Sequence, residues 1–213
     1  MLEKMISYYQ GNPGKYWNAV INHLTISLQV VFAAIIIGVV LGIICAKNEK
    51  SAKFISSYVN ILRVIPSLAL LVIMIPVLGI GRKSAIVALV VIAIPPIMIN
   101  TAAGLLGIEP NILETAKGMG MNSKQMFFDI ELPLAYPLIL TGIRTATVET
   151  IASASIASYI GAGGLGDLIF TGLGVNKTEI VLLGGLSIAI ISIVADLILA
   201  IYQSHVVRYM NEI

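Results

Sequence analysis

Four ionisable residues stand within or at the edge of long apolar runs: Arg63, Arg144, Glu149 and Asp196. A charge is costly in hydrocarbon, so such residues usually face water or a bundle interior, where they pair or line a path for a polar solute. Arg144 and Glu149 are five residues apart, about 140° around a helix, and need not pair with each other. Asp196 could instead pair between helices, and both arginines could reach the membrane boundary. Glu149 is the best candidate for a pathway, with Arg144 and Asp196 as further candidates.

Nucleophilic or metal-dependent catalysis would need side chains that this sequence keeps apart. His23 and His205 stand near opposite ends of the apolar part of the chain, so neither a metal site nor a serine–histidine pair is expected. The lone Cys45 lies inside an apolar run and cannot form a disulfide within the chain. An intramembrane protease, which needs a serine and a histidine at one depth, is therefore disfavoured.

A glycine-rich segment follows the apolar run that ends at Ile160. Gly161, Gly163 and Gly166 match the G-x-G-x-x-G pattern, which indicates dinucleotide binding only between a strand and a helix of a βαβ unit. Because this segment follows a membrane helix, we expect it, with Gly164, to form a compact outer loop or gate where glycine permits close backbone approach. The sequence holds no G-x-x-x-x-G-K-[ST] pattern, so a P-loop site for ATP is not expected in this chain.

Composition sets the class of protein. Of the 213 residues, 58% are hydrophobic and only 11% are charged, against roughly 25% charged residues in soluble domains. The mean hydropathy of +0.97 agrees. Soluble enzymes, nucleic-acid binders and disordered proteins are excluded together, and a net charge of +2 is too small to imply an acidic polymer as partner. The sequence predicts an integral membrane protein surrounded by lipid.

Five apolar stretches are long enough to cross a hydrocarbon core about 30 Å thick. They run from Leu24 to Ala46, from Phe54 or Ile61 to Ile80, from Ser84 to Ile108, from Leu134 to Ile160 and from Ile180 to Tyr202. The chain then divides into an extracytoplasmic segment, residues 1–23, a five-span domain, residues 24–206, and a cytoplasmic tail, residues 207–213. The first segment has no long apolar stretch, so no cleavable signal peptide is expected. A small excess of lysine and arginine on one set of loops favours an external N-terminus.

Small and helix-breaking residues interrupt these stretches. Four prolines lie in the second and third stretches, at Pro66, Pro76, Pro95 and Pro96. Each removes a backbone donor, so the freed carbonyls need partners in neighbouring helices or in a wet cavity. Gly38 and Gly42 form a small-xxx-small pair that lets another helix approach closely. The pattern favours a packed bundle of broken helices over a passive anchor.

A polar segment, residues 109–133, separates the third and fourth stretches. Pro110 can start a short helix that Gly120 ends in the left-handed conformation. Asn122 can cap a second short helix, with Gln125 in the capping-box position, and this helix would stop at Pro133. Its apolar side chains need either a protein groove or the headgroup region of the membrane: Met126, Phe127 and Ile130.

The same segment carries a family pattern: E-A-A, three residues, G, nine residues, I-x-L-P. It is matched by Glu114, Ala116, Gly120, Ile130, Leu132 and Pro133, while Thr115 replaces the second residue with another small side chain. The chain therefore resembles the permease subunits of binding-protein-dependent ABC importers. The resemblance implies that residues 109–133 are a cytoplasmic coupling loop that docks into an ATP-hydrolysing subunit.

Two further segments resemble the osmoprotectant branch of this family, which imports glycine betaine, carnitine, choline and similar quaternary amines. They are residues 63–70, RVIPSLAL, and residues 161–167, GAGGLGD. Methionine importers have a glycine-rich motif like the second, so a methionine or other small-solute permease is the alternative. An ATP-independent channel or carrier is the alternative from another class.

What the resemblance implies is an all-α, five-span bundle of the type I ABC importer permease kind in the bacterial inner membrane. The expected partners are a second permease subunit, identical or similar, two ATPase subunits and an extracytoplasmic substrate-binding protein, with no nucleic acid. The chain itself would be non-catalytic and hold no cofactor, because ATP and Mg²⁺ would bind the partner ATPase. It would form the translocation pathway by alternating access.

Overall fold

The computed structural model describes residues 1–48, 59 and 64–211, and these are almost entirely helical, with no strand among them. Two helices precede the first gap, α1 (Leu2–Gly11) and α2 (Pro13–Lys47). The others are α4 (Ser67–Leu78), α5 (Arg82–Leu106), α6 (Pro110–Gly118), α7 (Ser123–Gln125), the π-helical η1 (Met126–Glu131), α8 (Leu132–Ala157), η2 (Ser158–Ile160), α9 (Gly166–Gly174) and α10 (Thr178–Asn211). The all-α class predicted from the sequence is confirmed.

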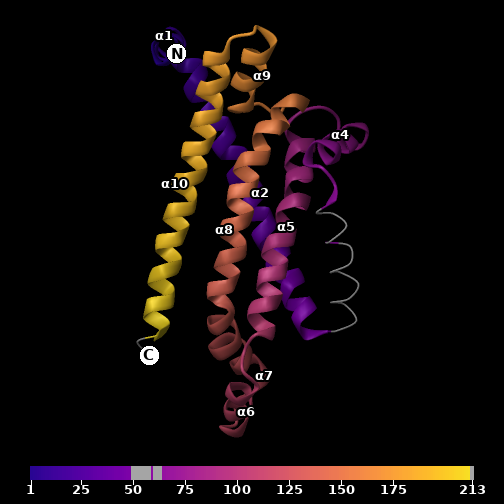
Figure 1. Cartoon of the computed structure of the whole chain (residues 1–213). Coiled ribbons are helices and arrows are strands. Elements are labelled where there is room, and N and C mark those ends of the chain that lie inside the picture. Colours follow the sequence, from indigo (N-terminus) through magenta and orange to yellow (C-terminus); the bar gives the residue numbers. More distant parts are fainter. Residues whose placement is uncertain (49–58, 60–63, 212–213) are drawn as a thin grey trace.

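The long helices α2, α5, α8 and α10 run side by side, and the two chain termini lie at opposite ends of this bundle (Figure 1). We call the end that holds α1 and α9 the outer end, and the end that holds α6 and α7 the hairpin end. Termini at opposite ends are expected for an odd number of crossings. The four long helices connect the outer end to the hairpin end.

Glycines let α5 sit tightly between α2 and α8. A Cβ on Gly38 would lie 2.9 Å from the Ile97 Cβ, and one on Gly42 would lie 2.8 Å from the Met98 carbonyl oxygen. On the other side of α5, a Cβ on Gly142 of α8 would lie 2.7 Å from the Pro96 carbonyl oxygen. The close helix approach predicted for Gly38 and Gly42 is therefore confirmed, and α5 is the partner.

Four helices among the described residues are long and apolar enough to cross a membrane: Pro13–Lys47, Arg82–Leu106, Ser123–Ile160 and Thr178–Arg208. The first begins well before Leu24, at Pro13. The predicted second span, from Phe54 or Ile61 to Ile80, includes residues 54–58 and 60–63, which lie outside the described residues, while 59 and 64–80 are described.

The described part of that stretch does not run to Ile80 as a straight span. The helix α4 has 12 residues, about 18 Å at 1.5 Å per residue, and lies at a steep angle to α5, beside its upper end (Figure 1). It starts after Pro66 and ends at Gly79, whose φ of 82° is left-handed. The interruption predicted at Pro66 is confirmed, because Pro66 and Gly79 bound a separate short helix, whereas Pro76 lies inside that helix without ending it.

Candidate functional site

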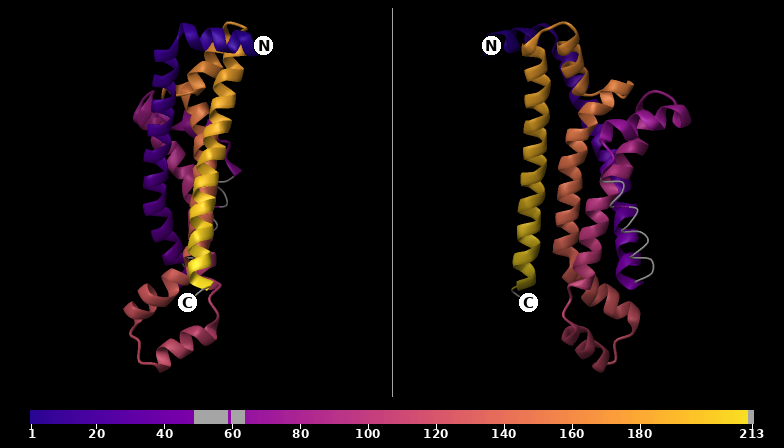
Figure 2. Two further views of the ribbon diagram at one scale, coloured as in Figure 1. Left: turned by 90° about the vertical axis from the view of Figure 1, so that its left-hand side faces the viewer. Right: turned by 45° about the vertical axis from the view of Figure 1, so that its right-hand side comes forward.

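The two short helices predicted between the third and fourth spans project from the hairpin end (Figure 2). The first, α6, starts at Pro110 and is closed by Gly120, which has a φ of 83°. The Gly120 N–H donates to the Lys117 carbonyl and the Met121 N–H donates to the Ala116 carbonyl, at 3.0 and 3.2 Å. This pair of bonds is a Schellman motif, so the predicted left-handed helix end is confirmed.

The second helix begins as the sequence predicts. The Asn122 Oδ1 accepts hydrogen bonds from the Lys124 and Gln125 backbone N–H groups, both at 3.0 Å. In return the Asn122 N–H donates to the Gln125 Oε1 at 2.9 Å, which completes a capping box. The start of α7 is thus held by its own side chains and needs no partner protein.

The prediction that this second helix stops at Pro133 is wrong. The chain continues through η1 into α8, and the Leu132 N–H donates to the Phe127 carbonyl, five residues back. The missing N–H of Pro133 falls in the first turn of α8, where a helix tolerates proline. Leu132 and Pro133 therefore join the hairpin to a long span without a break in the helix.

The apolar side chains of the hairpin are distributed differently from the prediction. The Phe127 ring is half-buried, with the Lys47 ammonium 4.1 Å from its centroid, so it faces the end of α2. Phe128 stacks edge-on against it at 5.0 Å and is 61% exposed. Met126 and Ile130 are half-buried. The sequence did not identify Phe128 as the exposed ring of the hairpin. Phe127 and Phe128 are adjacent, and spacing alone does not tell which of the two is covered.

The other residues of the family pattern lie on α6. Ala116 is buried where η1 packs on α6, whereas Glu114 and Thr115 are exposed. An apolar hollow of about 310 Å³ opens between the two helices, and its lining residues are Asn111, Ile112, Thr115, Ala116, Met119 and Ile130. An exposed carboxylate beside an apolar hollow and an exposed aromatic ring is a surface suited to docking another protein. The coupling role of these residues stays a prediction.

Arg144 of α8 and Asp196 of α10 join these two helices. The Arg144 Nε and Nη2 donate to the Asp196 Oδ1 at 3.0 and 2.9 Å. The Arg144 Nη1 donates to the Gln203 Oε1 at 2.8 Å, and the Gln203 Nε2 donates to the Thr141 Oγ1 at 2.8 Å. The pairing between helices suggested for Asp196 is confirmed, and Gln203 is a partner that the sequence did not reveal. A pathway role for Arg144 and Asp196 stays a prediction.

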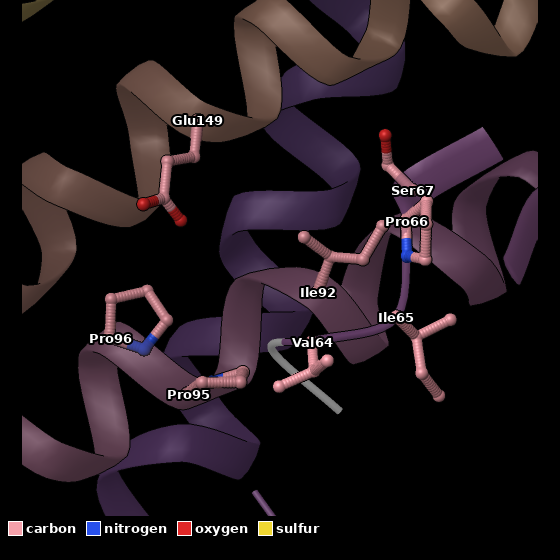
Figure 3. A pocket seen from close by; sticks show the side chains of 8 residues that line it. All are labelled: Val64, Ile65, Pro66, Ser67, Ile92, Pro95, Pro96 and Glu149. Carbon is pink, nitrogen blue, oxygen red and sulfur yellow. The ribbon is translucent and has the colours of Figure 1, made fainter. Parts of the chain in front are cut away.

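Glu149 borders a cavity of about 380 Å³ between α4, α5 and α8 (Figure 3). The remaining described lining residues are Val64, Ile65, Pro66, Ser67, Ile92, Pro95 and Pro96. Among the described residues, Glu149 therefore supplies the only ionisable side chain in this lining. Figure 3 shows its carboxylate pointing from α8 toward the two prolines of α5. Arg63, the fourth ionisable residue that the sequence singles out, lies outside the described residues.

The two prolines leave backbone carbonyls of α5 without their usual helical donors. Pro95 and Pro96 have no N–H, so the carbonyls of Val91 and Ile92, four residues earlier, receive no helical hydrogen bond from them. Glu149 is exposed in the single chain and also borders a second cavity of about 520 Å³ beside Arg144 and Asp196. Carbonyl dipoles and one carboxylate around an open cavity favour a cationic solute.

At the outer end the glycine-rich segment folds tightly. Gly161, Gly163 and Gly164 all have left-handed φ angles, of 76°, 81° and 104°. The Ser158 Oγ donates to the Gly163 carbonyl at 2.9 Å. A Cβ on Gly166 would overlap the Ser155 carbonyl oxygen, so α9 can start against α8 only from a glycine. The predicted compact loop is confirmed in its geometry, while its role as a gate stays a prediction.

This loop closes over His23, a residue that sequence reasoning left without a role. His23 is fully buried, and its Nε2 lies 3.0 Å from the Ile151 carbonyl oxygen, which accepts its hydrogen bond. A Cβ on Gly164 would lie 3.2 Å from the His23 Nδ1. Beside the loop, burial raises the pKa of the Asp167 carboxyl, and this is partly opposed by a hydrogen bond from Ser158 and by the charge of Lys15. His23 thus ties α2 to α8 beneath the loop.

A helical membrane bundle with a projecting hairpin at one end and a carboxylate-lined cavity defines the chain as a membrane component of a solute transporter. The chain belongs to the family described as "binding-protein-dependent transport system inner membrane component", whose model matches residues 38–208. It is accordingly a multi-pass protein of the bacterial inner membrane.

Two relatives from Bacillus subtilis (strain 168) match nearly the whole chain. The "choline transport system permease protein OpuBB" is 40% identical over 202 residues, covering 95% of this chain and 93% of the relative. The "glycine betaine/carnitine/choline transport system permease protein OpuCB" is 40% identical over 205 residues, covering 96% and 94%. Among solved structures, a chain of the inward-facing MetNI methionine ABC transporter is 26% identical with a TM-score of 0.80, covering 89% of this chain and 94% of that chain.

Proposed function

We propose that this chain is the permease subunit of an ATP-driven importer of quaternary amines such as choline, glycine betaine and carnitine. The similarity to two permeases named for these solutes, each over 95% or more of this chain, carries the proposal. Methionine is a second candidate, because the MetNI chain has a similar fold at 26% identity. The higher identity to the choline relatives favours the quaternary amines.

The cavity bordered by Glu149 fits the charge of such solutes. A quaternary ammonium group has no hydrogen to donate, so it is held by aromatic faces or by anionic and carbonyl oxygens. No aromatic side chain lines this cavity in the described part of the chain, and its polar lining is a carboxylate and a serine. Such a site attracts a cation weakly and releases it readily, which suits passage, while specific recognition would reside in the extracytoplasmic binding protein.

The open position of Glu149 supports pairing of two permease subunits. The residue is exposed in the single chain, although it lies within a candidate membrane span. An exposed carboxylate facing lipid is costly, so a second copy or a similar permease chain would enclose it and complete the pathway. The binding protein would dock at the outer end.

The hairpin supports coupling to ATP. Phe128, Met119 and Glu114 would contact an ATPase subunit, and η1 would pass the movement to α8. ATP and Mg²⁺ would be held by two such ATPase subunits, with no cofactor in this chain. Binding of ATP and of the loaded binding protein would then shift the bundle between inward-open and outward-open states, which is alternating access.

A competition experiment tests the substrate class. The complete transporter, with its ATPase and binding protein, is reconstituted into vesicles and labelled choline uptake is measured. Unlabelled glycine betaine, carnitine or methionine is then added in excess. The proposal expects the quaternary amines to compete and methionine to leave choline uptake unchanged. Competition by methionine alone, or ATP-driven uptake of methionine but not of choline, would contradict it.

A further inference from the structure

The first helix, α1, does not continue the bundle. It runs across the axis of α2 at the outer end, as the indigo helix in Figure 2 shows. The corner between them is formed by Asn12, whose N–H donates to the Tyr9 carbonyl, and by Pro13, which starts α2. Because α2 is a candidate membrane span, α1 lies roughly parallel to the membrane surface.

Helical spacing separates the side chains of α1 into two faces. The apolar face consists of Leu2, Met5, Ile6 and Tyr9. The polar face consists of Glu3, Lys4, Ser7 and Gln10. A short helix with an apolar stripe opposite a polar face is typical of helices that lie in a membrane interface.

The polar face is turned toward the outermost turn of the bundle. Glu3, Lys4 and Ser7 line a hollow together with Lys177 and Glu179, which lie just before and at the start of α10. Leu2 and Ile6 project from roughly the opposite side of the helix and are 73% and 52% exposed. The uncovered apolar side chains of Leu2 and Ile6 therefore point away from the turn that precedes α10.

Aromatic residues mark the level at which α1 lies. The rings of Tyr9 and Tyr16 meet edge-on at 5.2 Å, and those of Tyr16 and Trp17 at 5.5 Å. The Tyr16 hydroxyl lies 2.9 Å from the Ser187 Oγ of α10, and Trp17 is 52% exposed. Tyrosine and tryptophan gather at the headgroup level of membranes, where one end of the ring is apolar and the other is wet.

We propose that α1 is an in-plane interfacial helix, and that Leu2 and Ile6 insert into the lipid leaflet at the outer end. The occupant of this apolar face is lipid, because the face continues the apolar surface of the spans and the polar face is directed away from it. The side chains Glu3 and Lys4 carry opposite charges, so the contact rests on apolar burial and not on attraction to anionic headgroups.

The test uses the single tryptophan of the chain. In a Trp17→Phe background of the full-length protein, Ile6→Trp and Ser7→Trp place one reporter on each face of α1. Both variants are reconstituted into vesicles of phosphatidylethanolamine and phosphatidylglycerol, with or without bromine on the acyl chains. We expect brominated lipid to quench the tryptophan at position 6 several-fold more than that at position 7. Aqueous acrylamide should give the reverse order.

Two results would overturn the proposal. Equal quenching by brominated lipid at both positions would show that α1 has no lipid-facing side. A tryptophan at position 6 that is shielded from both brominated lipid and acrylamide would show that a protein surface, such as a second copy of this chain, covers the face instead. Circular dichroism of both variants shows whether the helix content is retained, and a second apolar-face reporter, Leu2→Trp, must repeat the position 6 result.

Discussion

Replacing Glu149 by glutamine removes one negative charge from the cavity between α4, α5 and α8 while keeping the size of the side chain. Choline carries one positive charge, whereas glycine betaine carries both signs and has no net charge. We therefore expect Glu149→Gln to slow choline import more than glycine betaine import. Comparing the two solutes in one preparation separates the loss of charge attraction from general damage to the fold.

The size of the cavity sets the expected magnitude. A sphere of about 380 Å³ has a radius of about 4.5 Å, so a cation at its centre would lie about 6 Å from the carboxylate oxygens. At that separation Coulomb's law gives about 0.7 kcal/mol in bulk water and about 2.8 kcal/mol at an effective dielectric constant of 20. These limits correspond to an approximately threefold to hundredfold change in the choline rate relative to the glycine betaine rate.

The assay is the initial rate of uptake into vesicles that hold the complete transporter, with the binding protein saturated by each solute. Glu3→Gln is the matched control, because it removes an exposed carboxylate from α1, far from the cavity, and should leave the ratio of the two rates unchanged. If Glu149→Gln slows both solutes equally, or neither, the carboxylate does not act on the passing cation and the cavity is not the pathway.

Three further changes test the positioning elements. Arg144→Met should lower the free energy of unfolding by about 2 to 3 kcal/mol, below the full cost for a buried pair because the two side chains are 29% and 41% exposed. The double change Arg144→Met with Asp196→Leu should recover most of that loss in the same thermal unfolding assay. Gly42→Ala should destabilise the bundle by about 1 to 3 kcal/mol, since the new Cβ would overlap α5. Phe128→Ala should weaken retention of the ATPase during co-purification by about 2 kcal/mol, and more than Phe127→Ala does.

Each of these has a control and a contradicting outcome. Gly185→Ala adds a Cβ that meets nothing within 4 Å and should be neutral or slightly stabilising, so equal losses at both glycines would refute the packing argument. A double variant that regains stability but not uptake would assign the arginine–aspartate pair to transport as well as to structure. If Phe127→Ala weakens retention of the ATPase more than Phe128→Ala does, Phe127 and not Phe128 is the ring that contacts the ATPase.

The hairpin shows what local sequence signals can predict. Its two helix ends depend on residues a few positions apart: Gly120 at the Schellman end, and Asn122 with Gln125 in the capping box. Such bonds form within one turn, so spacing alone reveals them. The spacing of Gly38 and Gly42 likewise predicted a close contact with another helix, although it did not identify α5 as that helix.

Side-chain contacts between residues far apart in the chain could not be predicted from the sequence. Asp196 was recognised as a candidate for pairing, but its partner Arg144 is 52 positions away, and the bond from His23 to the Ile151 carbonyl spans 128 positions. Pro133 was expected to end a helix, yet the π-helical turn before it carries the chain onward. Proline is tolerated in the first turn of a helix, so the residue alone does not tell a stop from a start.

The most direct test of the central claim measures solute accumulation and ATP hydrolysis together in one preparation of vesicles. The complete transporter is supplied with binding protein and labelled choline, with ATP either present or absent on the hairpin side. The account predicts that choline accumulates above its external concentration only with ATP and binding protein, and that the binding protein stimulates hydrolysis. Choline that merely equilibrates across the membrane without ATP would show a channel or carrier and would contradict the account.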